Sequence, residues 1–177
     1  SVTTIAHWVL ATRQILDDVP MLQSYVDGRL RYGLALVEEN QLLNGSGTGT
    51  DLAGIYTQAT AFAPPITIPA TVTRIDVLRL AMLQTALSEL MSTGVVLHPA
   101  DWAAIELLKD GQGQFIVGNP QGTITPTLWG QPVVSTQSMA TGKFLTGAFQ
   151  LGAQIFDRMD AVVEISTEDD QNFRKNL

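Results

Sequence analysis

The chain of 177 residues has the length of one domain, or of one domain with a smaller appendage, and can bury a sizeable core. Apolar residues make up 45% of it and charged residues only 15%, so its surface is thinly charged. Thin charge indicates a surface that meets other subunits, with a monomer of neutral surface as the alternative. The net charge of −7 disfavours a nucleic-acid-binding face, and the absence of Cys excludes disulfide scaffolds, zinc ribbons and thiol nucleophiles.

Neither a membrane span nor a signal peptide is expected. No segment approaches the ~18 consecutive apolar residues that a membrane helix requires. The first residues, SVTTIAHWVLATRQ, lack an initiator Met, a basic region and a clean apolar region. This start, and the abrupt stop after Glu168 to Leu177, indicate a segment of a longer protein.

One long helix dominates the first part of the chain. A short apolar run, Ile5 to Leu10, and a short helix, Thr12 to Asp18, precede it. The helix extends from about Met21 to Asn44, after Pro20, a residue favoured at helix starts. Its apolar residues form one face at near-helical spacing: Leu22, Tyr25, Val26, Leu30, Gly33, Leu34, Leu36 and Val37. At roughly 36 Å it is longer than the core of such a domain needs, which predicts an elongated subunit that reaches from one neighbour to another.

Glycines mark the middle and the end of this helix. Gly28 and Gly33 each cost about 1 kcal/mol relative to Ala, so we expect a neighbouring element to pack closely against both. Asn44-Gly45 is a helix stop signal.

The rest of the chain predicts helices followed by short strands. Two loops come first, at Gly45 to Gly54 and, rich in proline, at Ala63 to Pro69. A helix from about Thr73 to Ser92, which Gly94 ends, then leads to a buried strand at Val95 to Leu97 and to a second helix at Pro99 to Lys109, with His98 near its N-cap and Asp101 in its first turn. Further strands are expected at Phe115 to Val117, Val133 to Ser135, Phe144 to Phe149 and Ala161 to Ser166. This order indicates an α+β fold, with helices on a modest sheet.

The glycine-rich loop at Gly45 to Gly54 raises the question of phosphate binding. A phosphate cradle leaves a strand, opens a helix and carries a Lys before Ser or Thr. This loop follows a helix and contains no Lys, so the pattern favours a structural loop.

Other candidate chemistry is weak. His7 and His98 stand in no metal-ligand spacing, and Ser135 and Ser138 lie in no nucleophile elbow. Paired carboxylates occur at Asp17 with Asp18, Glu38 with Glu39, Asp157 with Asp160, and Glu168 to Asp170. Helix ends, solvated faces and turns explain these pairs, and a metal site at Asp157 and Asp160 is the alternative. Trp8, Trp102 and Trp129 are interpreted as anchors in the core or in an interface.

Several segments together resemble the major capsid proteins of tailed phages of the Hong Kong 97 type. They cover nearly the whole chain in family order and spacing: ATRQILDDVPMLQSYVDGRLRYGLALVEENQLLNGSGTG, GIYTQATAF, VVLHPADWAAIELLKDGQGQFI, LWGQPVVST, FLTGAFQLGAQIFDRMDAVVEIST and EDDQNFRKN. One departure is His98, where relatives commonly place Asn before the Pro.

The resemblance implies the architecture. Residues 1–44 and 154–177 would belong to a peripheral domain with a long spine helix. Residues 45–153 would form an axial domain, in which helices pack on a central, mainly antiparallel or mixed sheet.

The resemblance also implies the function. The chain would be part of a major capsid subunit, not an enzyme, with no cofactor, metal or catalytic residue. Its subunits would form pentamers, hexamers and the icosahedral shell around phage DNA, built in the bacterial host cytoplasm with a scaffolding region, a protease and a portal. We expect no membrane partner and no sequence-specific binding of nucleic acid. The segment alone is not expected to close into shells.

The resemblance singles out Asn176. In the covalently stapled subgroup, an Asn in this NFxKN context accepts a cross-link from a Lys, helped by a Glu. Both partners would lie outside these 177 residues, so Asn176 alone should be inert. A solvated surface Asn is the alternative interpretation.

Two alternatives to the phage capsid stay open. An encapsulin-type compartment would use the same fold without packaging DNA. An α+β enzyme or small-molecule-binding domain would use Asp157, Asp160 and the loop at 45–54.

Overall fold

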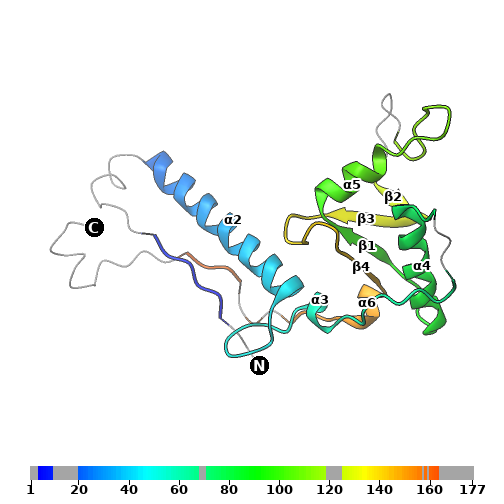
Figure 1. The fold of residues 1–177 in the computed structure, drawn as a ribbon. Helices are drawn as coiled ribbons and strands as arrows, with labels where there is room; N and C mark the ends of the chain where they lie inside the picture. Colours follow the sequence, from blue (N-terminus) through cyan, green and yellow to red (C-terminus); the bar gives the residue numbers. More distant parts are fainter. Residues whose placement is uncertain are drawn as a thin grey trace. The chain divides into compact units, whose positions relative to one another are not determined.

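The structure, a computed structural model, describes residues 4–9, 20–67, 71–118, 125–156, 158 and 160–163. The chain divides into two compact units, Ser1–Gly54 with Phe156–Leu177 and Ile55–Ile155 (Figure 1). The loop at 45–54 therefore groups with the long helix, and the assignment of peripheral and axial domains stays a prediction. The expected helix at Thr12 to Asp18 lies outside the described residues.

Helix α2 (Pro20–Asn44) is the main element of the first unit and confirms the predicted long helix. An extended segment, residues 4–9, lies against it (Figure 1). A Cβ placed at Gly33 would lie 3.2 Å from two atoms of the His7 ring, so the close packing expected at Gly33 is confirmed. At Gly28 the expectation is wrong within the described chain, where no described residue comes within 4 Å of such a Cβ.

The apolar face of α2 is only partly covered. Val26, Leu30 and Leu34 are half-buried, and Tyr25, Leu36 and Val37 are exposed. The one buried hydrophobic side chain described on this helix is Leu43, near its end. In the described part of this unit, α2 therefore buries little apolar surface.

The second unit is built on a mixed sheet of four short strands in the order β2-β3-β1-β4. The strands are β1 (Gly94–Leu97), β2 (Thr127–Leu128), β3 (Gln131–Ser135) and β4 (Phe144–Gly147). Strand β1 is parallel to β3 and antiparallel to β4, and β2 is antiparallel to β3. The predicted α+β class with a central mixed sheet is confirmed.

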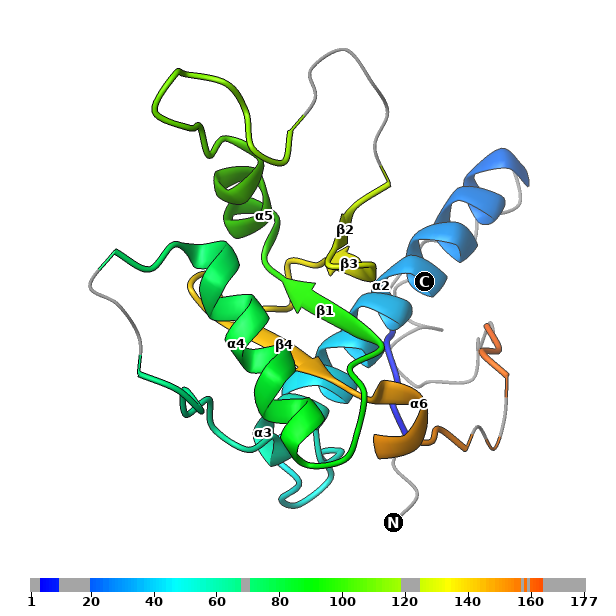
Figure 2. The same ribbon diagram turned by 90° about the vertical axis from the view of Figure 1, so that its right-hand side faces the viewer.

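Helices α4 (Arg74–Leu87) and α5 (Pro99–Glu106) contribute to one core with this sheet. Figure 2 shows α4 lying along β4. Register places Val95 of β1 beside Val133 of β3, so both point to one face of the sheet. The buried cluster consists of Leu78, Met82, Val95, Leu97, Ile105, Leu128 and Val133. Trp102 and Phe144 pack at its margin.

Helix α4 begins where it is expected and ends earlier. Thr73 is its N-cap and forms a capping box with Asp76. The predicted end at Ser92 is wrong, because Ser88 caps the helix and Glu89 has a φ of 62°, outside the helical region. Gly94, expected to stop the helix, is instead the first residue of β1.

Helix α5 confirms the predicted start. The Nδ1 atom of His98 accepts a hydrogen bond from the Ala100 amide at 3.1 Å, so His98 is the N-cap. Pro99 occupies the first turn, where its missing N–H costs nothing. The helix ends at Glu106, three residues before the expected Lys109.

Other sequence expectations need correction. Phe115 to Val117 is not a strand, because only a single bridge joins Phe115 to Lys109. The described residues 161–163 are irregular, and the rest of the expected strand to Ser166 lies outside the described chain. Strand β2 and the short helices α3 (Ile55–Gln58) and α6 (Phe149–Gly152) were not expected. Among the described residues, no helix combines the length and hydropathy of a membrane span.

A two-residue turn, Trp129-Gly130, joins β2 to β3. Trp129 has a φ of 54° and Gly130 a φ of 79°. Positive φ at both positions is the pattern of a type I′ hairpin turn, in which Asn-Gly is preferred. A left-handed conformation costs an L residue about 1–2 kcal/mol, so the backbone of Trp129 is strained in this turn.

Replacing His98 tests the cap of α5. His98→Ala removes the acceptor for the Ala100 amide and should lower the free energy of unfolding by about 1 kcal/mol, measured with urea. His98→Asn keeps a capping oxygen and should stay close to the wild type. Equal losses in both variants would contradict a capping role.

The Asp76 capping box predicts a pH dependence. The Thr73 hydroxyl donates to the carboxylate at 2.7 Å and the Thr73 amide at 2.9 Å, which together hold the pKa of Asp76 below its ordinary value of 3.8. A lowered pKa stabilises the fold above that ordinary value, and the stabilisation is lost as the pH falls through the folded pKa. Urea titrations from about pH 5 downward should therefore show a flatter loss of stability for Asp76→Asn than for the wild type. Parallel curves would exclude this contribution.

Candidate functional site

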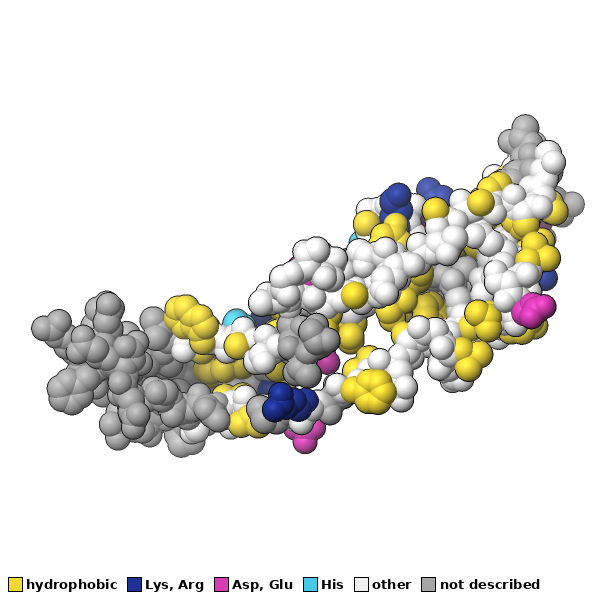
Figure 3. Space-filling model, turned by 90° about the horizontal axis from the view of Figure 1, so that it is seen from below, with side chains coloured by type: hydrophobic (Ala, Val, Ile, Leu, Met, Phe, Trp, Pro, Cys, Tyr) yellow, Lys and Arg dark blue, Asp and Glu magenta, His cyan; other side chains and the backbone are white. Residues whose placement is uncertain are grey.

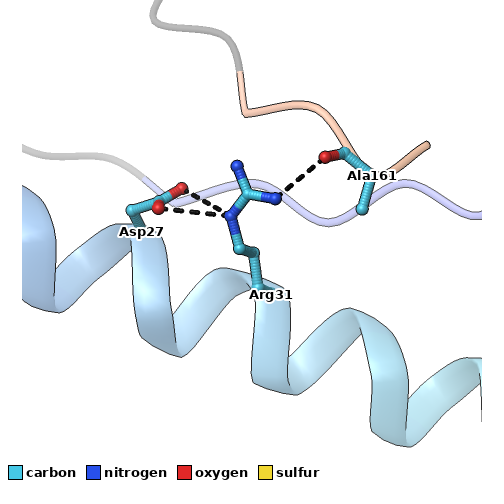
Figure 4. A network of polar contacts seen from close by, with 3 residues as sticks. All are labelled: Asp27, Arg31 and Ala161. Carbon is cyan, nitrogen blue, oxygen red and sulfur yellow. Dashed lines mark hydrogen bonds and ion pairs between the residues drawn. The ribbon is translucent and has the colours of Figure 1, made fainter.

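Arg31 joins α2 to a segment far along the chain (Figure 4). Its Nε atom lies 3.2 Å from both carboxylate oxygens of Asp27, one helical turn earlier. Its Nη1 atom donates a hydrogen bond to the carbonyl oxygen of Ala161 at 3.0 Å. The Asp27–Arg31 side chains are about half exposed, so the ion pair mainly orients the guanidinium. The bond to Ala161 then fastens residues 160–163 to the helix.

The loop at 45–54 is closed by its own hydrogen bonds. The Gly54 amide donates to the Gly45 carbonyl at 2.9 Å, and the Gly47 amide donates to Leu52 at 3.0 Å. A Cβ at Gly45 would overlap the Leu52 carbonyl, so this helix stop requires glycine because the backbone approaches it closely.

A carboxylate lies inside the same loop. Asp51 accepts hydrogen bonds from the Ser46 hydroxyl at 2.8 Å and from the side-chain amide of Gln41 at 3.4 Å. The amides of the loop already donate to its own carbonyl oxygens, and the Asp51 carboxylate would repel an anion. Both features disfavour a bound phosphate. The geometry favours the structural loop over the phosphate cradle.

Asp101 joins three parts of the second unit. Its carboxylate accepts a hydrogen bond from the Gly142 amide at 2.6 Å, and it lies 3.4 Å from Nη1 of Arg74. The Asp101 side chain is only 15% exposed, whereas Arg74 is 60% exposed, so solvent still screens the ion pair and the Gly142 hydrogen bond is the better protected contact. The acidic residue expected in the first turn of α5 therefore also fixes the start of α4 and the loop between β3 and β4.

Among the candidate catalytic residues that the structure describes, none are brought together. His7 packs on α2 and His98 caps α5, in different units. Ser135 is exposed and Ser138 is half-buried in the loop before β4. Asp160 is exposed, whereas Asp157 and Asn176 lie outside the described residues. Among the described residues, no three His, Asp or Glu side chains form a group that could hold a metal.

The three tryptophans differ in environment. Trp102 packs against the core of the second unit, as expected of an anchor. Trp8 and Trp129 are instead 77% and 60% exposed. Large apolar side chains are also exposed on both units, among them Met21, Tyr25, Tyr32, Leu87, Met91, Leu107, Ile116, Val134, Leu151 and Phe156. On the face in Figure 3, yellow apolar side chains are widespread and charged side chains are few. Such a surface is suited to contact with other protein.

Comparison with known proteins gives a consistent result. The model of the "Phage capsid family" matches residues 1–177. The chain is 50% identical over 177 residues to a protein named "Major capsid protein" of Enterobacteria phage HK97. The match covers 100% of this chain and 46% of that relative, so the chain spans less than half of the relative's length.

Substitution of Arg31 tests the fastening of residues 160–163. Arg31→Gln removes the donor to Ala161, and the released segment should be cleaved by trypsin after the exposed Arg158 several times faster. Asp27→Asn is the matched control, because it removes the ion pair and leaves that donor in place. Mass spectrometry of the fragments measures the rates. Equal acceleration in both variants would show that the ion pair, not the backbone bond, holds the segment.

Proposed function

Because the chain belongs to the phage capsid family, we propose that it is part of a major capsid subunit that builds the icosahedral shell of a phage or prophage. The observation that carries the proposal is the 50% identity along the whole chain to the HK97 major capsid protein. The fold is the α+β fold of a Hong Kong 97-type capsid homologue. The chain covers 46% of that relative, so the activity and partners of the whole protein belong to the proposal.

The proposed work is mechanical. Copies of the subunit associate around five-fold and quasi-six-fold axes through heterologous interfaces that close into rings. The thin charge of the chain and its exposed apolar side chains support this role, because such surfaces favour contact with protein. The shell encloses phage DNA in the virion after assembly in the host cytoplasm, with a scaffolding region, a protease and a portal as partners. The phage name of the relative favours this function over an encapsulin-type compartment.

Asn176 is the proposed acceptor of a covalent cross-link in the assembled shell. The support is its position in the sequence NFRKN. An amide carbon is a poor electrophile, so the reaction needs a desolvated Lys and an acid–base group from elsewhere in the protein. The chain by itself supplies structure, and any bond formation belongs to the assembled particle.

Expression of the full-length protein tests this function. Light scattering and negative-stain microscopy should show rings or closed shells. Denaturing electrophoresis of the same particles should show linked subunits, and Asn176→Asp should abolish them without preventing assembly. A full-length protein that stays monomeric at high concentration would overturn the proposal, and unlinked subunits in intact wild-type shells would remove only the role of Asn176.

A further inference from the structure

The turn between β2 and β3 presents an aromatic ring to solvent at a conformational cost. Trp129 holds a φ of 54° beside Gly130, in a position that Asn would occupy with less strain. Large residues rarely adopt this conformation, and strained residues of this kind cluster at functional sites. The ring remains 60% exposed, so burial in the described chain does not offset the strain.

Among the described residues, Trp129 makes a cation–π contact. The guanidinium carbon of Arg79, on α4, lies 5.8 Å from the centre of the Trp129 ring. Neither of the two ion pairs among the described residues involves Arg79. No carboxylate oxygen of a described residue therefore lies within 4.0 Å of the Arg79 guanidinium. Within the described chain, the pair therefore offers an exposed ring beside a positive charge that no carboxylate pairs.

We propose that Trp129 and Arg79 form an anchor that docks onto a second copy of this chain in the assembled shell. This inference rests on the proposed function. Trp and Arg are the residues most enriched at the energetic centres of protein interfaces. A second copy also supplies the complementary charge, because the chain carries 17 acidic and 10 basic residues. A carboxylate of the neighbour would pair with Arg79 while the indole ring is buried.

A nucleic acid fits this anchor less well. Bases stack on aromatic rings, but binding of the backbone requires clustered Lys and Arg. Arg79 is the one cation that the described contacts place at Trp129, on a chain of net charge −7. The charge pattern therefore favours protein over DNA as the occupant.

Substitutions in the full-length protein test the anchor. Trp129→Asn installs the residue pair that this turn prefers, so the unfolding temperature of unassembled subunits should stay the same or rise. The protein concentration at which half of the subunits enter shells should nevertheless increase about tenfold or more. Arg79→Gln, on an exposed helix position, should raise this concentration in the same direction with an unchanged unfolding temperature.

Glu89→Asn is the matched control, because Glu89 is the other non-glycine residue with positive φ in the described chain. It should relieve strain and leave assembly unchanged. Wild-type assembly in both Trp129→Asn and Arg79→Gln would overturn the inference. Shells that form normally but retain less DNA would identify a DNA contact and overturn it as well. A wild-type protein that forms no shell would instead overturn the proposed function on which the anchor rests.

Discussion

The second unit depends on one strand. Strand β1 is paired on both edges, in parallel with β3 and antiparallel with β4, and its Val95 is completely buried. Because its backbone groups are satisfied by neighbours on each side, it can lie in the interior where no water reaches it. Helices α4 and α5 share the core to which Val95 and Leu97 contribute. At the margin of this unit, the Asp101 carboxylate accepts a hydrogen bond from the Gly142 amide and fixes the loop between β3 and β4.

The sequence predicts best where the determinants are local. Pro20 and Asn44-Gly45 mark the ends of α2, and His98 before Pro99 marks the start of α5, because caps and stops act within one helical turn. The sequence predicts secondary structure less well where the conformation of a turn or a pairing with another strand decides it. Strand β2 and its hairpin with β3 escape detection because Trp129 stands where a turn usually shows Asn. The early end of α4 at Leu87 follows from the conformation of Glu89, which helical periodicity does not reveal.

The polar contacts show the same division. The spacing of Asp27 and Arg31 is that of an ordinary ion pair on a helix and could have been found by inspection. The hydrogen bond from Arg31 to Ala161 could not be predicted, because it involves a backbone carbonyl, which has no sequence signature, 130 residues along the chain. Arg79 and Trp129 are likewise far apart in sequence, and neither is exceptional until the hairpin brings them together. Asn176 was singled out by resemblance alone, so its role stays a prediction.

The division into two units has a consequence for synthesis. The second unit is one continuous stretch, Ile55–Ile155, inserted between the two parts of the first. A ribosome therefore synthesises every residue of the inserted unit before it makes Ala161, the partner of Arg31. The hydrogen bond that fastens residues 160–163 to α2 cannot form until the whole second unit has been synthesised.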